Sequence, residues 1–296
     1  MSSVAFGKSS WPAMSWPRGR HVTNVHAMPI EIRHQDGRLL YQSPRAHDLR
    51  EALAQARDAR IDLAGANLEG ADLRSADLER ARLDGAKLAG ASLRHANLEE
   101  VSLVHADLRG ARLDGANLEH AELEGADLRE ANLRGSNLEH AILVRANLTN
   151  GALDGSNMEH ADLREAILEH ANLARTNLEH AQMRGTKAHA ACFTSANLEN
   201  ADMRNADLSA VGATSANFER ADMRGASLVD AVLSGSSLEK ADMRGADLTN
   251  ADFTEASLER ADLHDARLEG VKFDGADLDG ARGLDRVRPP SSGPYR

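Results

Sequence analysis

A glutamate recurs every 20 residues along most of the chain, and these carboxylates are the most regular chemically active groups in the sequence. The members are Glu79, Glu99, Glu119, Glu139, Glu159, Glu179, Glu199, Glu219, Glu239 and Glu259. If residues 20 apart stack at the spacing of neighbouring strands, adjacent carboxylates lie about 4.8 Å apart and repel by about 0.9 kcal/mol even in water. Stability therefore does not explain this column. One interpretation is a linear polyanion that binds a basic protein groove; the other is passive duplication of a 20-residue unit.

The residue after each glutamate determines how much negative charge stays uncompensated. Arg220, Lys240 and Arg260 follow the later glutamates, whereas His120, His140, His160 and His180 follow those in the middle and are neutral at pH 7. We expect the working face to be the stretch without cationic neighbours. The predicted partner-binding residues are Glu99, Glu119, Glu139, Glu159, Glu179 and Glu199.

Three other columns have structural or surface interpretations. Asparagines at 20-residue spacing from Asn97 to Asn217 are expected to form a hydrogen-bonded ladder. A column of arginines from Arg164 to Arg244 mostly follows aspartates by two residues, which predicts a self-neutralised side. The four histidines are possible zinc ligands, but one column lacks tetrahedral geometry and contains no cysteine, so we expect surface histidines and no metal.

The sequence carries no catalytic signature. It contains no GxSxG, HExxH or Walker loop. Cys192 has His189 three residues earlier, but no third group orients the pair. We therefore expect no enzyme and no cofactor.

These columns depend on a five-residue repeat that runs without insertion or deletion from Ile61 to Ala281. Every fifth residue from Leu63 to Leu278 is Leu, Met or Phe, except Ala188 and Ala213, and the residue two places earlier is usually Ala. Only these two positions of each five are regularly apolar, so both are predicted to point inward. Phe193 would fill the space that Ala188 and Ala213 leave.

The repeated phrase A-(D/N)-L-x-x, as in Ala71-Asp72-Leu73, Ala116-Asn117-Leu118 and Ala246-Asp247-Leu248, resembles the pentapeptide-repeat family. The resemblance covers about three quarters of the chain. It implies an all-β solenoid, namely a right-handed, four-sided β-helix with four pentapeptides in each coil. The repeats would make about 11 coils.

The flanking segments predict the following domain organisation. Residues 1–27 are rich in Ser, Pro and Gly and are expected to be a disordered arm. Residues 28–60 combine a hairpin around Asp36-Gly37 with an amphipathic helix, for which Ser43-Pro44 is the expected N-cap and first residue. They are expected to cap the repeats at 61–281, and 282–296 form a flexible tail. That end has the weaker cap, so the protein is a monomer or an end-to-end homodimer.

Composition limits the remaining possibilities. The net charge is −11, but residues 61–281 carry 22 basic and 40 acidic side chains, a net −18, between basic ends. Such a surface repels phosphates, so we expect no nucleic-acid binding. No run of 18 apolar residues or signal-like segment is present, and with one cysteine we expect a cytoplasmic protein without a membrane partner.

Two functions remain open. The resemblance to the quinolone-resistance group of the family implies a DNA mimic, which binds DNA gyrase or topoisomerase IV and protects this type II topoisomerase from a poison. The alternative is a protein-interaction scaffold for another partner. A structural filler or secreted effector gains no support from the N-terminal sequence.

Overall fold

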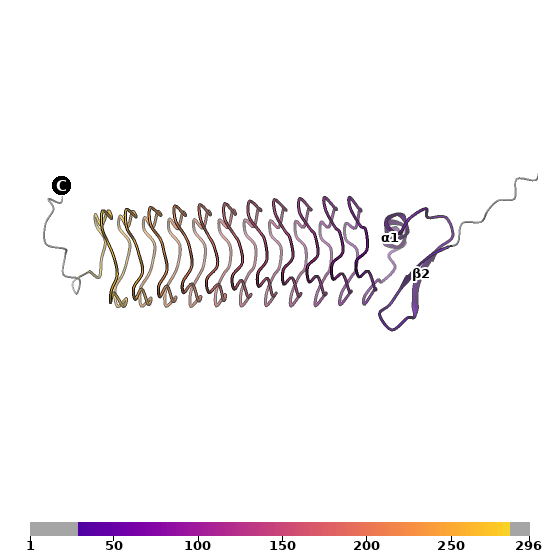
Figure 1. The fold of residues 1–296 in the computed structure, drawn as a ribbon, viewed down its shortest axis with the longest axis horizontal. Coiled ribbons are helices and arrows are strands. Elements are labelled where there is room, and N and C mark those ends of the chain that lie inside the picture. Colours follow the sequence, from indigo (N-terminus) through magenta and orange to yellow (C-terminus); the bar gives the residue numbers. More distant parts are fainter. Residues whose placement is uncertain (1–28, 285–296) are drawn as a thin grey trace, which may run out of the picture.

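The computed structural model describes residues 29–284, which form a long rod with a small cap at one end (Figure 1). The cap contains strands β1, Ile30–Arg33, and β2, Leu39–Ser43, followed by helix α1, Leu49–Asp58. The arm expected at 1–27 and the tail from 285 onward lie outside the described residues. The described part includes no helix with the length and hydrophobicity that a membrane crossing requires.

Coils of 20 residues stack along the rod. Parallel bridges join each residue at the Asp/Asn position to the residue 20 later, from Asn67 and Lys87 to Asp262 and Arg282. The backbone bonds alternate in direction: the Leu118 N–H donates to the Asn137 carbonyl at 2.6 Å, and the Asn137 N–H donates to the Ala116 carbonyl at 3.0 Å. The β-helix predicted from the sequence is confirmed.

The interior consists of the two apolar positions of each repeat. Leu118, Met183 and Ala121 are 0–1% exposed, and the same holds for nearly all equivalent residues from Leu63 to Leu263. Phe193, Ala188 and Ala213 are all buried. The rod therefore needs no large central core, because each unit buries one small and one medium side chain against its neighbours.

The last residue of each repeat has a left-handed backbone. For example, φ is +56° at His120 and +57° at His140, although this region is unfavourable for residues with a Cβ. The stack compensates: the corner N–H of His120 donates to the Glu139 carbonyl at 3.0 Å. These bonds fix the corner and so the direction of the side chain that leaves it.

The hairpin covers the first coil of the rod. Strands β1 and β2 pair antiparallel, with Ile32 opposite Tyr41, and Gly37 in the turn has φ +89°. The Asn67 N–H then donates to the Arg33 carbonyl at 2.8 Å, and the Gln35 N–H donates to the Gly65 carbonyl at 2.9 Å. The predicted hairpin is confirmed, and it satisfies backbone groups that an open end would leave unpaired.

Helix α1 lies where the sequence predicts it but begins later. Its N-cap is Asp48, whose Oδ1 accepts a hydrogen bond from the Glu51 N–H at 2.9 Å. The prediction that Ser43 is the N-cap is wrong. This residue ends β2, and its hydroxyl donates to Gln55 Oε1 at 2.6 Å. The buried residues Ala52, Leu53 and Ala56 form the face that packs on the core of the rod.

Candidate interaction face

The six predicted glutamates lie in one column at the first turn position after a buried Leu or Met. The side chains from Glu119 to Glu199 are partly exposed, with an exposed fraction that falls from 37% at Glu119 to 26% at Glu199. The asparagine two residues earlier fixes the backbone of each glutamate. The Glu139 N–H, for example, donates to Asn137 Oδ1 at 3.3 Å. The carboxylates therefore leave the rod from a fixed backbone.

An asparagine ladder holds the carboxylates in place. Asn157 Nδ2 donates to Asn137 Oδ1 and to Glu139 Oε2, both at 3.2 Å, and the same pair of bonds recurs at Asn137, Asn177, Asn197 and Asn217. Asn117 donates to Glu99 Oε2 at 3.3 Å. The predicted Asn ladder is confirmed from Asn117 to Asn217, whereas Asn97 donates to Asp77 Oδ1 instead. The ladder orients all six glutamates, which the sequence did not predict.

The second carboxylate oxygen faces an imidazole. Glu139 Oε1 lies 3.8 Å from His140 Nε2, and the corresponding distances at Glu119, Glu159 and Glu179 are 3.7–3.8 Å. The rings of His120, His140, His160 and His180 stack with centroids 4.9 Å apart and planes within 5°. We call the four glutamates from Glu119 to Glu179, with these four histidines, the Glu–His face.

Cations close this face at both ends. Arg220 reaches back one coil, and its NH1 lies 2.8 Å from Glu199 Oε1, while NH2 lies 2.9 Å from Glu219. The expectation that Glu199 lacks a cationic neighbour is wrong, because the arginine side chain spans a full coil. Near Glu99, Arg80 pairs with Glu79 and Glu100 and lowers the pKa of Glu100. Between these ends, no Lys or Arg among residues 29–284 forms an ion pair with the four glutamates.

The family model described as Pentapeptide repeats matches this chain in eight copies that together span most of it. The copies lie at 59–90, 76–115, 111–150, 152–187, 191–228, 214–250, 226–265 and 246–282. The chain belongs to the pentapeptide-repeat family.

Several solved pentapeptide-repeat structures are similar to this chain. HetL, which is involved in heterocyst differentiation regulation in the cyanobacterium Nostoc sp. strain PCC 7120, is 31% identical, with 79% of this chain and 96% of HetL covered and a TM-score of 0.44. Full-length QnrB1, a plasmid-mediated fluoroquinolone resistance protein, is 19% identical, with 73% and 90% covered and a TM-score of 0.34. A thylakoid-lumen protein of Arabidopsis thaliana is 29% identical, with 39% and 67% covered and a TM-score of 0.26. No curated protein matches the chain.

Another side of this pentapeptide-repeat rod is neutralised by pairs within one repeat. Arg164, Arg204, Arg224 and Arg244 each contact the aspartate two residues earlier, at 2.5–2.6 Å. The hydrogen bond from Arg244 lowers the pKa of Asp242, and Arg204 does the same for Asp202. The predicted self-neutralised side is confirmed.

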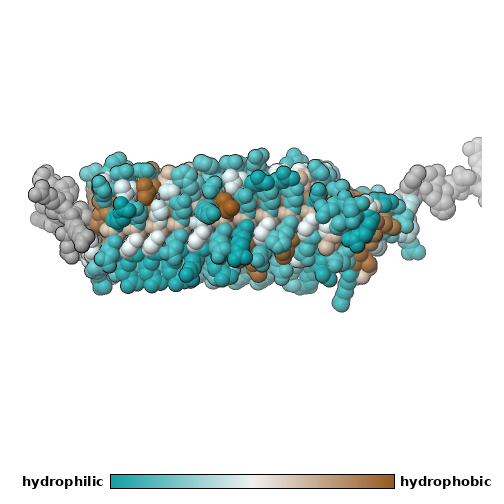
Figure 2. Space-filling view, turned by 90° about the horizontal axis from the view of Figure 1, so that it is seen from below, coloured by the Kyte–Doolittle hydropathy of each residue, from teal (hydrophilic) through white to brown (hydrophobic). Residues whose placement is uncertain are grey.

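The other candidate chemistries do not assemble. Cys192 Sγ lies 3.4 Å from Thr194 Oγ1, whereas His189 Nδ1 lies 2.9 Å from Ser209 Oγ, so the two residues do not form a pair. Within residues 29–284, no group of three or more His, Cys, Asp or Glu side chains could hold a metal ion. The surface is largely hydrophilic, with isolated apolar residues along the rod (Figure 2).

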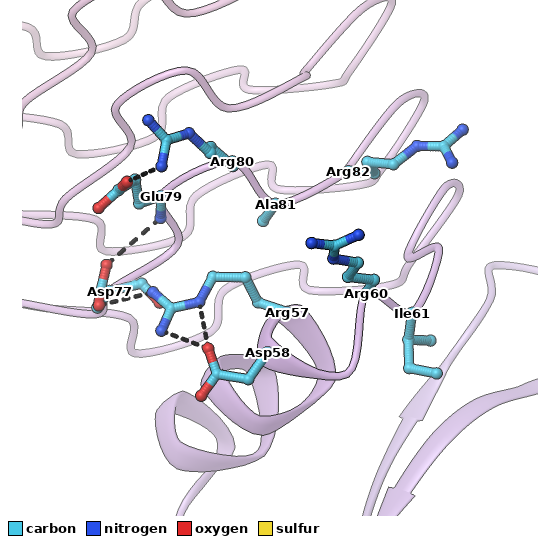
Figure 3. A pocket seen from close by; sticks show the side chains of 9 residues that line it. All are labelled: Arg57, Asp58, Arg60, Ile61, Asp77, Glu79, Arg80, Ala81 and Arg82. Carbon is cyan, nitrogen blue, oxygen red and sulfur yellow. Dashed lines mark hydrogen bonds and ion pairs between the residues drawn. The ribbon is translucent and has the colours of Figure 1, made fainter.

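A charged cavity that the sequence did not predict lies between α1 and the first coils (Figure 3). It measures about 630 Å³, and arginines and acids alternate around it. Arg57 contacts Asp58 at 2.8 Å and Asp77 at 2.6 Å, and Arg80 contacts Glu79 at 2.8 Å. Of these, the Arg57–Asp77 pair joins the cap to the rod. The sequence could have indicated this cavity, because arginines occur at 57 and 60 and again, about one coil later, at 80 and 82.

Proposed function

We propose that this pentapeptide-repeat protein is a non-enzymatic acidic rod that binds a basic protein partner through the Glu–His face. The best-supported partner is a type II topoisomerase, DNA gyrase or topoisomerase IV, which the rod would engage as a DNA mimic and protect from a poison. The proposed rod is right-handed and four-sided with about 11 coils, as the repeats imply, and it acts in the cytoplasm without a cofactor.

The charge of the repeats supports an electrostatic partner. Residues 61–281 carry a net charge of −18, and with 20 residues and 4.9 Å per coil this is about one net negative charge per 3 Å of axis. Duplex DNA carries one per about 1.7 Å. The rod thus has roughly half the charge density of DNA, enough to steer it towards a groove that is complementary to a polyanion.

The observation that carries the proposal is the fixed, uncompensated row of carboxylates from Glu119 to Glu179. The Asn ladder holds one oxygen of each, and an imidazole rather than a Lys or Arg faces the other. A partner therefore meets anions that are already ordered, and binding loses less side-chain entropy than with free glutamates. Glu99 and Glu199 extend the row, but Arg220 already compensates Glu199.

A supercoiling assay with DNA gyrase, with and without a poison, tests the proposal. Replacing Glu119, Glu139, Glu159 and Glu179 by Gln removes four charges and keeps an oxygen acceptor for each Asn. We expect weaker binding to gyrase, mainly through slower association, and loss of protection.

A matched control uses the same column. Replacing Glu79, Glu219, Glu239 and Glu259 by Gln removes the same number of charges, but each of these glutamates already contacts Arg80, Arg220, Lys240 or Arg260. We expect a smaller effect. Equal activity of wild type and both variants would show that the Glu–His face does not bind the topoisomerase.

One observation favours the scaffold function instead. The charge density is half that of DNA, and the Arg–Asp side is neutral, so the rod is anionic mainly along one face rather than all around. If the rod neither binds gyrase nor competes with duplex DNA for it, binding another basic protein as a scaffold becomes the better-supported function. Loss of binding to that protein in the four-Gln variant would still identify the face.

A further inference from the structure

The carboxylates of the Glu–His face repeat at a fixed distance along the rod. The imidazoles beside them stack 4.9 Å apart, and each coil follows the same path as the one before (Figure 1). Three such steps separate Glu119 from Glu179, so the four carboxylates span about 15 Å. The asparagine bonds, all 3.2 Å long, hold one oxygen of each carboxylate at this spacing. A partner that pairs with all four must present its cations at a similar spacing.

The two edges of this face differ in height. On the asparagine side, the corners are Gly135 and Gly155, with φ of +59° and +71°. Apart from its chain neighbours, a Cβ at either glycine would meet no atom of the described residues within 4 Å. On the other side, the side chains of His140 and His160 leave their own corners and are 42% exposed. The face is therefore low along the glycines and raised along the histidines.

The backbone of the face is already paired within the stack. The Asn157 N–H donates to the Ser136 carbonyl at 2.9 Å, and the Met158 N–H donates to the Asn177 carbonyl at 2.7 Å. These bonds run along the rod from one coil to the next, so the face offers side chains and not a strand edge. A partner cannot add a strand here, because strand addition requires free backbone groups.

An α-helix along the rod matches the spacing of the carboxylates. Its rise of about 1.5 Å per residue places side chains at i, i+3, i+7 and i+10 on one side over about 15 Å. Side chains on one side of an extended strand lie about 6.6 Å apart, so four of them span about 20 Å. The fourth cation of a strand would then lie one coil further, beside Glu199, which Arg220 already contacts at 2.8 Å. A strand therefore matches fewer of the four carboxylates than a helix does.

We infer that the element that docks on the Glu–His face is an α-helix of the partner protein with Lys or Arg at i, i+3, i+7 and i+10. The inference rests on the proposed binding through this face and names the part of the partner that binds. The four glutamate side chains are 33–37% exposed, which leaves their carboxylates accessible to such cations. The helix lies over the glycine edge and against the histidine rings.

Three designed peptides and the full-length protein test the helix. The striped peptide is Ala-rich, has about 20 residues and carries Lys at i, i+3, i+7 and i+10. The scattered peptide has the same composition with its lysines on different sides of the helix. The proline peptide keeps the stripe, but two prolines prevent the helix. Measured by fluorescence anisotropy at low ionic strength, the striped peptide should bind at least about fivefold more tightly than either control.

Two sets of protein variants locate the docked helix. The four-Gln variant should lose the preference for the striped peptide. Gly135→Gln with Gly155→Gln fills the low edge with neutral side chains, and Glu130, with φ +60°, shows that a corner accepts a side chain of this size. This variant should bind the striped peptide at least about threefold more weakly. Gly90→Gln with Gly110→Gln is the matched control, because these corners are equally open but border another side of the rod.

Equal affinities of the three peptides would overturn the helix. If the four-Gln substitutions still weakened all three, the Glu–His face would remain the binding site; affinities that ignore these substitutions would overturn the face as well. Unchanged binding by the Gly135 and Gly155 variant would also overturn the docked helix. Replacing Lys8, Arg18 and Arg20 by Gln should have no effect. Tighter binding of the striped peptide to that variant would show that the chain's own basic residues occupy the face, which would overturn a partner helix.

Discussion

His140 and His160 stack with ring centroids 4.9 Å apart and planes 1° apart, and each imidazole lies beside the glutamate of its own coil. Their spacing repeats from coil to coil because both side chains leave left-handed corners with φ +57°. The stack therefore places a row of imidazoles directly against the candidate binding face.

Mild acid should weaken the interaction with a basic partner. Histidine is the side chain that most often changes charge near neutral pH, and any positive charge on the four imidazoles would offset the four carboxylates. We expect the affinity to fall at least about threefold at constant ionic strength, measured by surface plasmon resonance. Replacing the four histidines by Asn, the residue at Asn200 in the same column with φ +57°, should abolish most of this fall. An unchanged pH dependence would exclude the histidines.

Removing the Ser156 hydroxyl should stabilise the protein. Ser136 Oγ donates to the Leu133 carbonyl at 2.6 Å, but the equivalent Leu153 carbonyl is taken by Thr176 Oγ1 at 3.0 Å. The buried Ser156 Oγ therefore has no partner within residues 29–284. We expect Ser156→Ala to raise the free energy of unfolding by about 1 kcal/mol and Ser136→Ala to lower it, measured by urea unfolding. Destabilisation by both would contradict the difference in hydrogen bonding.

Truncating Phe193 should leave a large cavity. Its ring is 1% exposed, and Ala188 and Ala213, the two small residues of its series, are 0% exposed. We expect Phe193→Ala to cost about 3–5 kcal/mol. Phe273→Ala provides the matched control because its ring lies in the partly exposed last coil, and the cost should be smaller. Thermal unfolding of the two variants checks the order, and equal costs would show that the end is packed as tightly as the middle.

The Arg–Asp pairs within single repeats should make stability sensitive to strong acid. Hydrogen bonds from arginine lower the pKa of Asp242 and Asp202 below 3.8, and Arg74 lowers that of Asp72 to about 2. A carboxyl with a lowered folded pKa stabilises the fold above its unfolded pKa, and this contribution is lost as the pH falls through the folded value. We expect stability to decline between about pH 4 and 2. Circular dichroism should show a flatter decline for Asp202→Asn with Asp242→Asn.

The sequence by itself determined the architecture of the rod. The apolar positions of the repeat, such as Leu118 and Ala121, predicted the buried residues, and these are buried. The 20-residue spacing of Asn137 and Asn157 predicted the ladder, and the turn pair Asp36-Gly37 predicted the hairpin; both are confirmed. These features repeat or are local. A residue's neighbours then follow from its place in the period, because every coil imposes the same backbone path on the next.

The tertiary structure decided the contacts that cross from one unit to another. Arg220 reaches Glu199 in the preceding coil, Arg57 joins α1 to Asp77, and Asp48 rather than Ser43 caps α1. The stacking of four imidazoles also appears only in the folded chain. A period fixes where each Cα lies, but long side chains choose among several rotamers, and their partners depend on which charges and hydrogen-bond acceptors the neighbouring coil leaves free.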